Sequence, residues 1–149
     1  MPAQFHVLAV EDEDADAQFI ERVGGQNPLA ASFRVLRSAE DAQRYLSGQD
    51  PYADRARFPL PNLILLDLKL RGVTGLQLLR WIRQTAQLRS VSVVVLSGTA
   101  NATDLNRAYE LGIDAYIVKP VDLKIFAATL TGVLVSLVGA ADPAQQPKR

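Results

Sequence analysis

The sequence predicts an α/β fold in which a parallel sheet is covered by helices on both faces. Five short apolar segments alternate with five segments of helical periodicity, and this alternation implies parallel strands with right-handed crossovers. Polar side chains follow four of the apolar segments, at the edge where open sheets of this kind bind ligands. The predicted strands are residues 5–10, 32–37, 63–66, 91–96 and 114–118.

The third apolar segment is the one around which the chain is organised. Residues 63–66 follow Pro61 and are too short for a helix, so we expect a strand that is buried on both faces. Asp67 ends this strand, and Gly72 and Gly75 mark a turn behind it. A carboxylate in this place either caps the next helix or lies in a site at the end of the strand, because burying it unpaired costs several kcal/mol.

The helices are predicted from apolar spacing and from residues that cap helix ends. The sequence predicts a helix over 15–23 after Asp14, a second over 38–47 and a third over 75–88. Asn101 or Thr103 begins a fourth helix that Gly112 closes, and Asp122 caps a last helix that runs to 138. The segment 48–61 is expected to be a long loop. Residues 1–138 form one domain, and 139–149 are expected to be a disordered tail.

The composition limits the kinds of site and partner. The chain has 149 residues and no cysteine, which excludes disulfides and thiolate metal sites. Lys plus Arg and Asp plus Glu are 16 each, so there is no electrostatic case for a nucleic-acid partner. The first residues lack the basic segment of a secretory signal. Polar residues interrupt the apolar stretch 123–138, which is shorter than the ~20 residues of a spanning helix. We expect a cytoplasmic protein that does not enter a membrane.

Four strand ends carry side chains suited to one reaction. Glu11 and Asp12 follow the first strand, Asp67 the third, Ser97 the fourth and Lys119 the fifth. Three converging carboxylates repel one another and need a cation, and Mg²⁺ prefers such oxygen ligands. An aspartate beside Mg²⁺ is a competent nucleophile toward a phosphoryl group. The ammonium of Lys119 and the hydroxyl of Ser97 would then stabilise the developing charge.

Four motifs in the chain resemble those of the receiver domains of two-component response regulators. They are VEDED at 10–14, LILLDLKLRGVTG at 63–75, VVVLSG at 93–98 and DAYIVKP at 114–120. The resemblance spans about residues 5–138 and implies a flavodoxin-like sheet with the strand order 2-1-3-4-5. It also implies a role for each matching residue. Asp67 is the phosphoacceptor. Glu11, Asp12, Asp67 and the backbone carbonyl of Lys69 hold Mg²⁺. Ser97 and Lys119 contact the phosphoryl group, Ser97 and Tyr116 form the switch, and Pro120 follows a cis peptide bond.

Two residues depart from the family pattern. Arg71 stands where the family usually has proline, four residues after the phosphoacceptor, which affects the stiffness of that loop. Lys69 places a cation beside the expected metal site, where it would weaken Mg²⁺ binding or alter dephosphorylation. The remaining site residues match the pattern.

The resemblance implies a stand-alone response regulator rather than an enzyme in the usual sense. Such a protein accepts a phosphoryl group from a sensor histidine kinase, assists its own phosphorylation and dephosphorylation, and signals through its fourth helix, fifth strand and fifth helix. A narrower resemblance is to single-domain regulators partnered with bacterial or cyanobacterial phytochrome kinases. One alternative is a degenerate receiver that acts as a constitutive protein-interaction module. Another is a small phosphatase of the haloacid dehalogenase type, which would need a second acid where Lys69 stands.

The last helix predicts a homodimer. Its apolar residues cover an arc too wide for one stripe facing the sheet, so some of them face outward. A patch of this kind is most readily buried against a second copy about a two-fold axis. The alternative is that Tyr52 and Phe58 of the long loop cover the extra residues. The apolar residues are Leu123, Ile125, Phe126, Leu130, Val133, Leu134, Val135, Leu137 and Val138.

Overall fold

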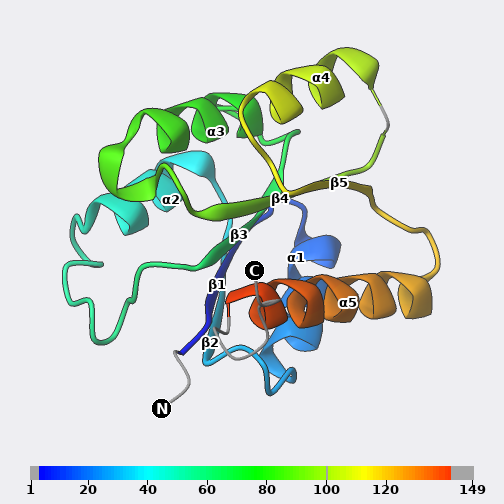
Figure 1. The fold of residues 1–149 in the computed structure, drawn as a ribbon, viewed down its shortest axis with the longest axis horizontal. Coiled ribbons are helices and arrows are strands. Elements are labelled where there is room, and N and C mark those ends of the chain that lie inside the picture. The colour runs from blue at the N-terminus through cyan, green and yellow to red at the C-terminus, as the bar shows by residue number, and fades with distance from the viewer. Residues whose placement is uncertain (1–3, 100, 142–149) are drawn as a thin grey trace, which may run out of the picture.

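The chain forms a five-stranded parallel sheet with helices on both faces (Figure 1). This computed structural model describes residues 4–99 and 101–141. The strand order is β2-β1-β3-β4-β5, which confirms the predicted fold. The strands are β1 (His6–Val10), β2 (Ser32–Leu36), β3 (Leu63–Asp67), β4 (Ser92–Ser97) and β5 (Ala115–Val118). The helices are α1 (Asp14–Gly25), α2 (Ala39–Ser47), α3 (Gly75–Gln84), α4 (Ala102–Glu110) and α5 (Leu123–Ala141), with a 3₁₀ helix at Ala86–Leu88.

The sheet divides the apolar core into two layers. Helices α2, α3 and α4 lie on one face, and α1 and α5 lie on the other (Figure 1). Because side chains alternate along a strand, each central strand contributes to both layers. This explains why β1, β3 and β4 read as unbroken apolar runs. Leu8, Val10, Ile64, Leu66, Val93 and Val95 face the first layer, and Val7, Ala9, Leu63, Leu65, Val94 and Leu96 face the second.

The register of the strands aligns their carboxyl ends. Val10 pairs with Leu66, Asp67 pairs with Leu96, and Ser97 pairs with Val118. The residues that follow β1 and β5 therefore emerge at the same edge as Asp67 and Ser97. The sheet alone brings the predicted site residues together.

Side-chain caps begin three helices where the sequence predicts them. Ser38, Asn101 and Asp122 each accept hydrogen bonds from backbone N–H groups in the first turns of α2, α4 and α5. The predicted cap at Asp14 is wrong. Asp14 is the first residue of α1, and its carboxylate lies 2.6 Å from Arg37 Nη1. The ion pair with the end of β2 draws this side chain away from the helix terminus.

Helix α3 is shorter than predicted. Thr74 and Gln77 form a capping box at its start, as each side chain accepts a hydrogen bond from the other residue's backbone N–H. The helix ends at Gln84 because Thr85 is extended, and the Thr85 hydroxyl donates to the carbonyl of Trp81 at 2.7 Å. The 3₁₀ helix completes the segment that was predicted as one continuous helix.

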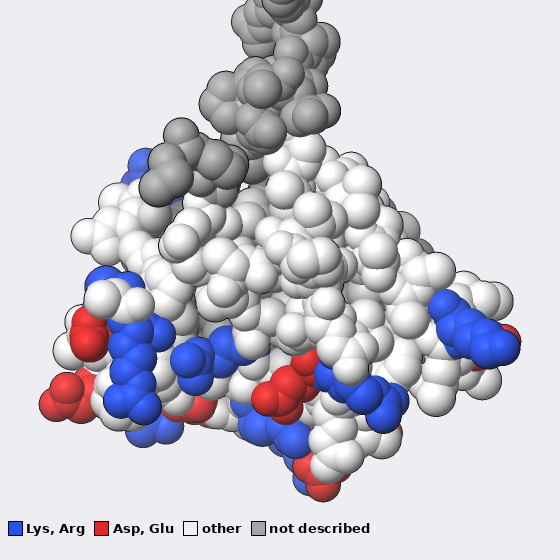
Figure 2. Space-filling view, turned by 90° about the horizontal axis from the view of Figure 1, so that it is seen from below, with Lys and Arg blue, Asp and Glu red and all other residues white. Residues whose placement is uncertain are grey.

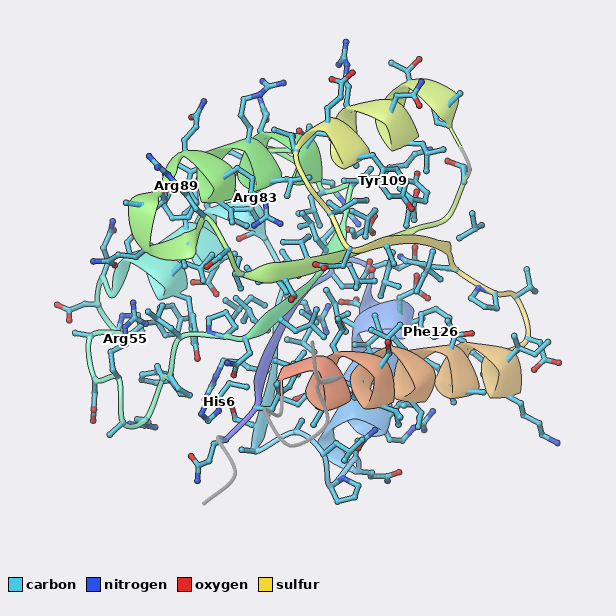
Figure 3. All side chains as sticks on the ribbon, in the orientation of Figure 1. His6, Arg55, Arg83, Arg89, Tyr109 and Phe126 are labelled. Carbon is cyan, nitrogen blue, oxygen red and sulfur yellow. The ribbon has the colours of Figure 1, made fainter. Side chains whose placement is uncertain are left out.

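The long loop between α2 and β3 is ordered by its own side chains. Arg55 donates to the carbonyls of Tyr45, Leu46 and Phe58 at 2.8 to 3.2 Å, and so satisfies the last carbonyls of α2 (Figure 3). Tyr52 and Phe58 pack against Tyr45, in the layer on the α2 side. This loop therefore does not cover α5, and the predicted alternative to an exposed α5 face is wrong.

Helix α5 packs one side on the sheet and leaves the other open. Phe126 points from α5 toward the sheet (Figure 3), and Leu130 and Leu134 are buried beside it. The helix reaches Ala141 rather than ending at Val138, and the remainder of the predicted tail, 142–149, lies outside the described residues. Within residues 4–99 and 101–141, no helix combines the length and apolar character needed to cross a membrane.

Gly75 holds α3 close to the backbone of the predicted phosphoacceptor. A Cβ atom at this position would meet the carbonyl oxygen of Asp67 and lie 2.5 Å from Leu68 Cα. Backbone atoms cannot rotate away as a side chain does, so α3 would have to move.

We predict that Gly75→Ala lowers the free energy of unfolding by about 1–3 kcal/mol, the usual cost of overpacking. Gly132→Ala is the matched control, because nothing lies within 4 Å of its Cβ position in α5. That control should stabilise the protein by about 0.5–1 kcal/mol through helix propensity. Urea denaturation of both variants measures the two changes, and equal changes would refute the close approach.

Candidate functional site

Three carboxylates meet at the carboxyl ends of β1 and β3. Glu11 and Asp12 directly follow β1, and Asp67 is the last residue of β3. Each offers one oxygen, and these oxygens lie within 4.8 Å of one another. The predicted acidic cluster is therefore brought together, in a part of the molecule where Glu11 and Asp67 are buried.

Lys119 follows β5 and binds this cluster through its ammonium group. Its Nζ donates to Glu11 Oε2 at 2.6 Å and to Asp67 Oδ2 at 3.1 Å. A third hydrogen bond, of 2.9 Å, goes to Asp16 Oδ2 in the first turn of α1. Burial by itself lowers the pKa of Lys119, but the hydrogen bonds that its ammonium donates to Glu11 and Asp16 outweigh this effect and raise that pKa. Lys119 is thus a permanently charged donor.

Asp16 is the residue that the sequence analysis missed. It carries no motif of its own, since an acid in the first turn of a helix is common for reasons of helix stability alone. The only signal in the sequence was its position, about one helical turn after the acidic pair Glu11 and Asp12. The contact with Lys119 depends on how α1 leaves β1, which the sequence does not specify.

Glu11 is the most buried carboxylate of the site, with 1% of its surface exposed. Burial raises its pKa from 4.5 to about 7, and the hydrogen bond from Lys119 offsets only part of that effect. Its Oε1 atom also accepts the backbone N–H of Glu13 at 3.1 Å. When no cation is bound, Glu11 is therefore partly protonated near neutral pH.

Asp67 is oriented through both of its oxygens. Oδ1 accepts the backbone N–H of Lys69 at 2.9 Å, while Oδ2 accepts from Lys119. The side chain of Lys69 itself is exposed. Metal binding by the Lys69 backbone carbonyl remains a prediction.

The loop after Asp67 is held by carboxylates instead of by a proline ring. The backbone N–H of Arg71 donates to Asp12 Oδ2 at 2.9 Å, and the Arg71 Nε atom lies 3.6 Å from the same oxygen. Proline has no N–H and could not make the first contact. Glu40 of α2 accepts the N–H of Val73 at 3.1 Å. The loop is therefore anchored at two points despite the departure from the family pattern.

The two predicted switch residues lie beside the site and are joined through Thr99. Ser97 is 1% exposed, and its hydroxyl accepts the N–H of Thr99 at 3.4 Å. The Tyr116 hydroxyl donates to the carbonyl of Thr99 at 3.1 Å. The backbone N–H of Lys119 donates to the Ser97 carbonyl at 2.7 Å. These bonds connect the ends of β4 and β5.

The predicted cis peptide bond before Pro120 is wrong. Among the described residues, the cis bond is the one between Asp50 and Pro51. Lys119 nonetheless reaches the acidic cluster, where its ammonium contacts Glu11 and Asp67.

The donor set fits a hard divalent cation. Glu11, Asp12 and Asp67 offer carboxylate oxygens, and Mg²⁺ combines one or a few carboxylates with water. Part of their charge is offset by Lys119 and, at Asp12, by Arg71. A cation would bind next to Lys119 and reduce its hold on the carboxylates.

Comparisons with known proteins agree on one family. The family model for the response regulator receiver domain matches residues 7–131. Response regulator Rcp1 of Synechocystis sp. is 33% identical over 127 residues, which cover 85% of this chain and 84% of Rcp1. The structure of the phosphorylated cyanobacterial phytochrome response regulator RcpA has a TM-score of 0.80 at 30% identity, and it covers 88% of this chain and 91% of RcpA. The Mn²⁺-bound form of Rcp1 has a TM-score of 0.77 at 32% identity, with coverage of 87% and 91%.

The raised pKa of Glu11 predicts a pH-dependent metal affinity. A cation needs the ionised carboxylate, so below about pH 7 it must displace a proton. The dissociation constant for Mg²⁺ should rise as the pH falls from 8 to 6, approaching tenfold per unit below the pKa. Without metal, stability depends on pH in the opposite direction to metal affinity: the protonated form favours folding, and this contribution is lost as the pH rises from 4.5 through about 7.

Calorimetric titration with Mg²⁺ at pH 6, 7 and 8 measures the effect. Glu11→Gln is the control, because it removes the titrating group and should flatten the dependence. A wild-type affinity that is equal at pH 6 and pH 8 would contradict the assignment.

Proposed function

The chain belongs to the response regulator receiver domain family, and we propose that it accepts a phosphoryl group on Asp67 from a partner histidine kinase in a Mg²⁺-dependent reaction. The observation that carries this proposal is the position of the Asp67 carboxylate. It lies at the end of a buried strand, 3.1 Å from the Lys119 ammonium and within 4.8 Å of two further carboxylates. The site therefore combines a nucleophile, a fixed positive charge and a set of metal ligands.

The residues of the chain divide the work of the transfer. An oxygen of Asp67 attacks phosphorus while the phosphorus–nitrogen bond of the kinase phosphohistidine breaks, and the imidazole leaves with the electron pair. The backbone N–H of Lys69 orients the Asp67 carboxylate. The Lys119 ammonium, which contacts Asp67, would form an ion pair with the phosphoryl oxygens as they gain negative charge. Mg²⁺ held by Glu11, Asp12, Asp67 and the Lys69 carbonyl would neutralise the remaining charge. In the reverse half of the cycle, water attacks phosphorus, the bond to the Asp67 oxygen breaks, and inorganic phosphate leaves with the free carboxylate restored. The same residues would thus assist both phosphorylation and dephosphorylation.

The two alternative functions receive less support. A phosphatase of the haloacid dehalogenase type needs an acid two residues after the nucleophile, where this chain has the exposed Lys69. A degenerate receiver would lack a working site, whereas here the nucleophile, lysine and acidic pair are all within reach of one another. Arg71 supports the loop through its N–H, and its guanidinium is largely exposed.

The proposed output runs from the site to the surface of α4, β5 and α5. A phosphoryl oxygen on Asp67 would attract the Ser97 hydroxyl and compete with its weak contact to Thr99 N. Thr99 also accepts the hydroxyl of Tyr116, which is half-buried on β5. Phosphorylation would thus bias a two-state arrangement of the β4–α4 loop and Tyr116.

The relatives suggest the identity of the partner kinase. RcpA is a phytochrome response regulator, and the chain matches it over most of its length. We therefore propose a kinase of the phytochrome type and a cytoplasmic location. Phosphotransfer from a co-expressed phytochrome kinase, absent with an unrelated kinase, is the direct measurement.

A homodimer through α5 completes the proposal. Val121 is 100% exposed, and Leu123, Ile125 and Val135 are each exposed by more than half. Figure 2 shows a broad surface without charged side chains on the side of the molecule that carries α5, and most of the charged side chains in this view lie along its lower rim. Lys124 is the one charged residue of α5. A second copy would bury this apolar surface without leaving charges unpaired.

We predict that Asp67 is the sole phosphorylation site. Incubation with acetyl phosphate and Mg²⁺ should raise the intact mass by one phosphoryl group, and Asp67→Asn should abolish the increase because the nucleophilic oxygen is lost. Ser97→Ala is the control, since it keeps Asp67 and should still gain the mass. A modified Asp67→Asn protein, or loss of the modification in Ser97→Ala, would contradict the assignment.

We predict that Val135→Glu gives a folded monomer. The side chain is 55% exposed in the single chain, so the charge is tolerated there but not in a dimer interface. Light scattering over a range of concentrations measures the mass. Leu134→Glu should instead unfold the protein, because Leu134 is 1% exposed, and Leu60→Glu, at an exposed position in the loop before β3, should leave the dimer intact. Wild-type protein that is monomeric at high micromolar concentration would refute the dimer.

A further inference from the structure

Lys119 has more partners than the proposed phosphotransfer requires. Its ammonium uses its three donors on Glu11, Asp67 and Asp16, at 2.6, 3.1 and 2.9 Å. The first two partners also belong to the acidic cluster that would hold a cation. Asp16 does not: the described residues that can share one ion are Glu11, Asp12 and Asp67. Asp16 is thus a partner for the lysine alone.

The position of Asp16 separates it from the other two carboxylates. It comes from α1, and its side chain is 33% exposed, against 1% for Glu11 and 7% for Asp67. Asp16 lies nearer to solvent and outside the acidic cluster, whereas Glu11 and Asp67 are buried within it. Asp16 is therefore the partner that can keep Lys119 when a cation or a phosphoryl group engages the buried pair.

We propose that Asp16 is a positioning residue that draws Lys119 away from Glu11 and Asp67 and so opens the acidic cluster to Mg²⁺. This inference rests on the proposed Mg²⁺-dependent function. Without Asp16, the ammonium is left with Glu11 and Asp67 as its ligands and competes with the cation for them. With Asp16 present, Lys119 keeps one partner outside the cluster and stays close enough to bind a phosphoryl group on Asp67.

The bland explanation for Asp16 is that an acid in the first turn stabilises α1. Asp14 supplies the matched comparison, because it lies in the same turn and carries the same charge. Its partner is Arg37, and its side chain is 87% exposed. Replacing either acid removes one negative charge and one favourable helix-end interaction, but only Asp16 contacts Lys119.

Calorimetric Mg²⁺ titrations of Asp16→Ala and Asp14→Ala test the proposal. Asp16→Ala should weaken Mg²⁺ binding about threefold or more, in line with a partly exposed charge pair. Asp14→Ala should change it by less than about twofold. Asp16→Asn is a second variant that keeps the shape of the side chain, should the alanine variant lose stability in thermal unfolding. Equal affinities of the Asp16 and Asp14 variants would overturn the proposal.

A double-mutant cycle with Lys119→Met separates positioning from simple loss of charge. If Asp16 acts through the lysine, its replacement should have no effect on Mg²⁺ affinity when Lys119 is already methionine. A weakening that persists in the Lys119→Met background would show direct attraction between Asp16 and the cation, and would reject the role assigned here. Wild-type protein that binds no Mg²⁺ would refute the proposed function itself, and with it this extension.

Discussion

The site depends on the ion pairs that the Lys119 ammonium forms with Glu11 and Asp67. A parallel sheet aligns the ends of its strands, and here that alignment forces Glu11, Asp12 and Asp67 within 4.8 Å of one another. Like charges at this distance disfavour ionisation, particularly at Glu11, which is buried. Lys119 offsets this repulsion. It follows β5, the strand at the edge of the sheet, and its backbone N–H donates to the carbonyl of Ser97 at the end of β4. Lys119 therefore supplies part of the positive charge that a bound cation would add to the site.

The strand pattern could be predicted because burial on both faces leaves a simple signal. Residues 63–66 and 91–96 are apolar without interruption, as they must be when each face meets a helix layer. The site followed from the same reasoning, since polar residues at the ends of parallel strands share one edge. Asp67, Glu11, Asp12 and Lys119 were all placed correctly in this way. Their mutual distances were set by the register, which the hydrophobic pattern largely determines.

Several features that the sequence does not reveal depend on side-chain contacts between distant parts of the chain. Asp14 has the residue type and position of a helix cap, yet an arginine at the end of β2 captures its carboxylate. Asp16 has no motif, and its role depends on the angle at which α1 departs from β1. Arg71 left the stiffness of its loop open, and its N–H forms a bond to Asp12 that proline cannot make. Long-range contacts of this kind leave no periodic trace in the sequence, so local patterns cannot reveal them.

The link between the site and the surface of α5 follows from the same geometry. Lys119 leads directly into the start of α5, and its N–H is bonded to Ser97, while Tyr116 is bonded to Thr99. Further along, Phe126, Leu130 and Leu134 fix α5 to the sheet. The packed part of the helix resists displacement, because close-packed interiors have little free space. A movement of Lys119 would therefore be taken up most easily by the segment that leads into α5, where Val121 and Leu123 are exposed. That segment adjoins the apolar surface proposed for the dimer, so the proposed phosphorylation of Asp67 and the proposed contact between two copies would act on the same few residues.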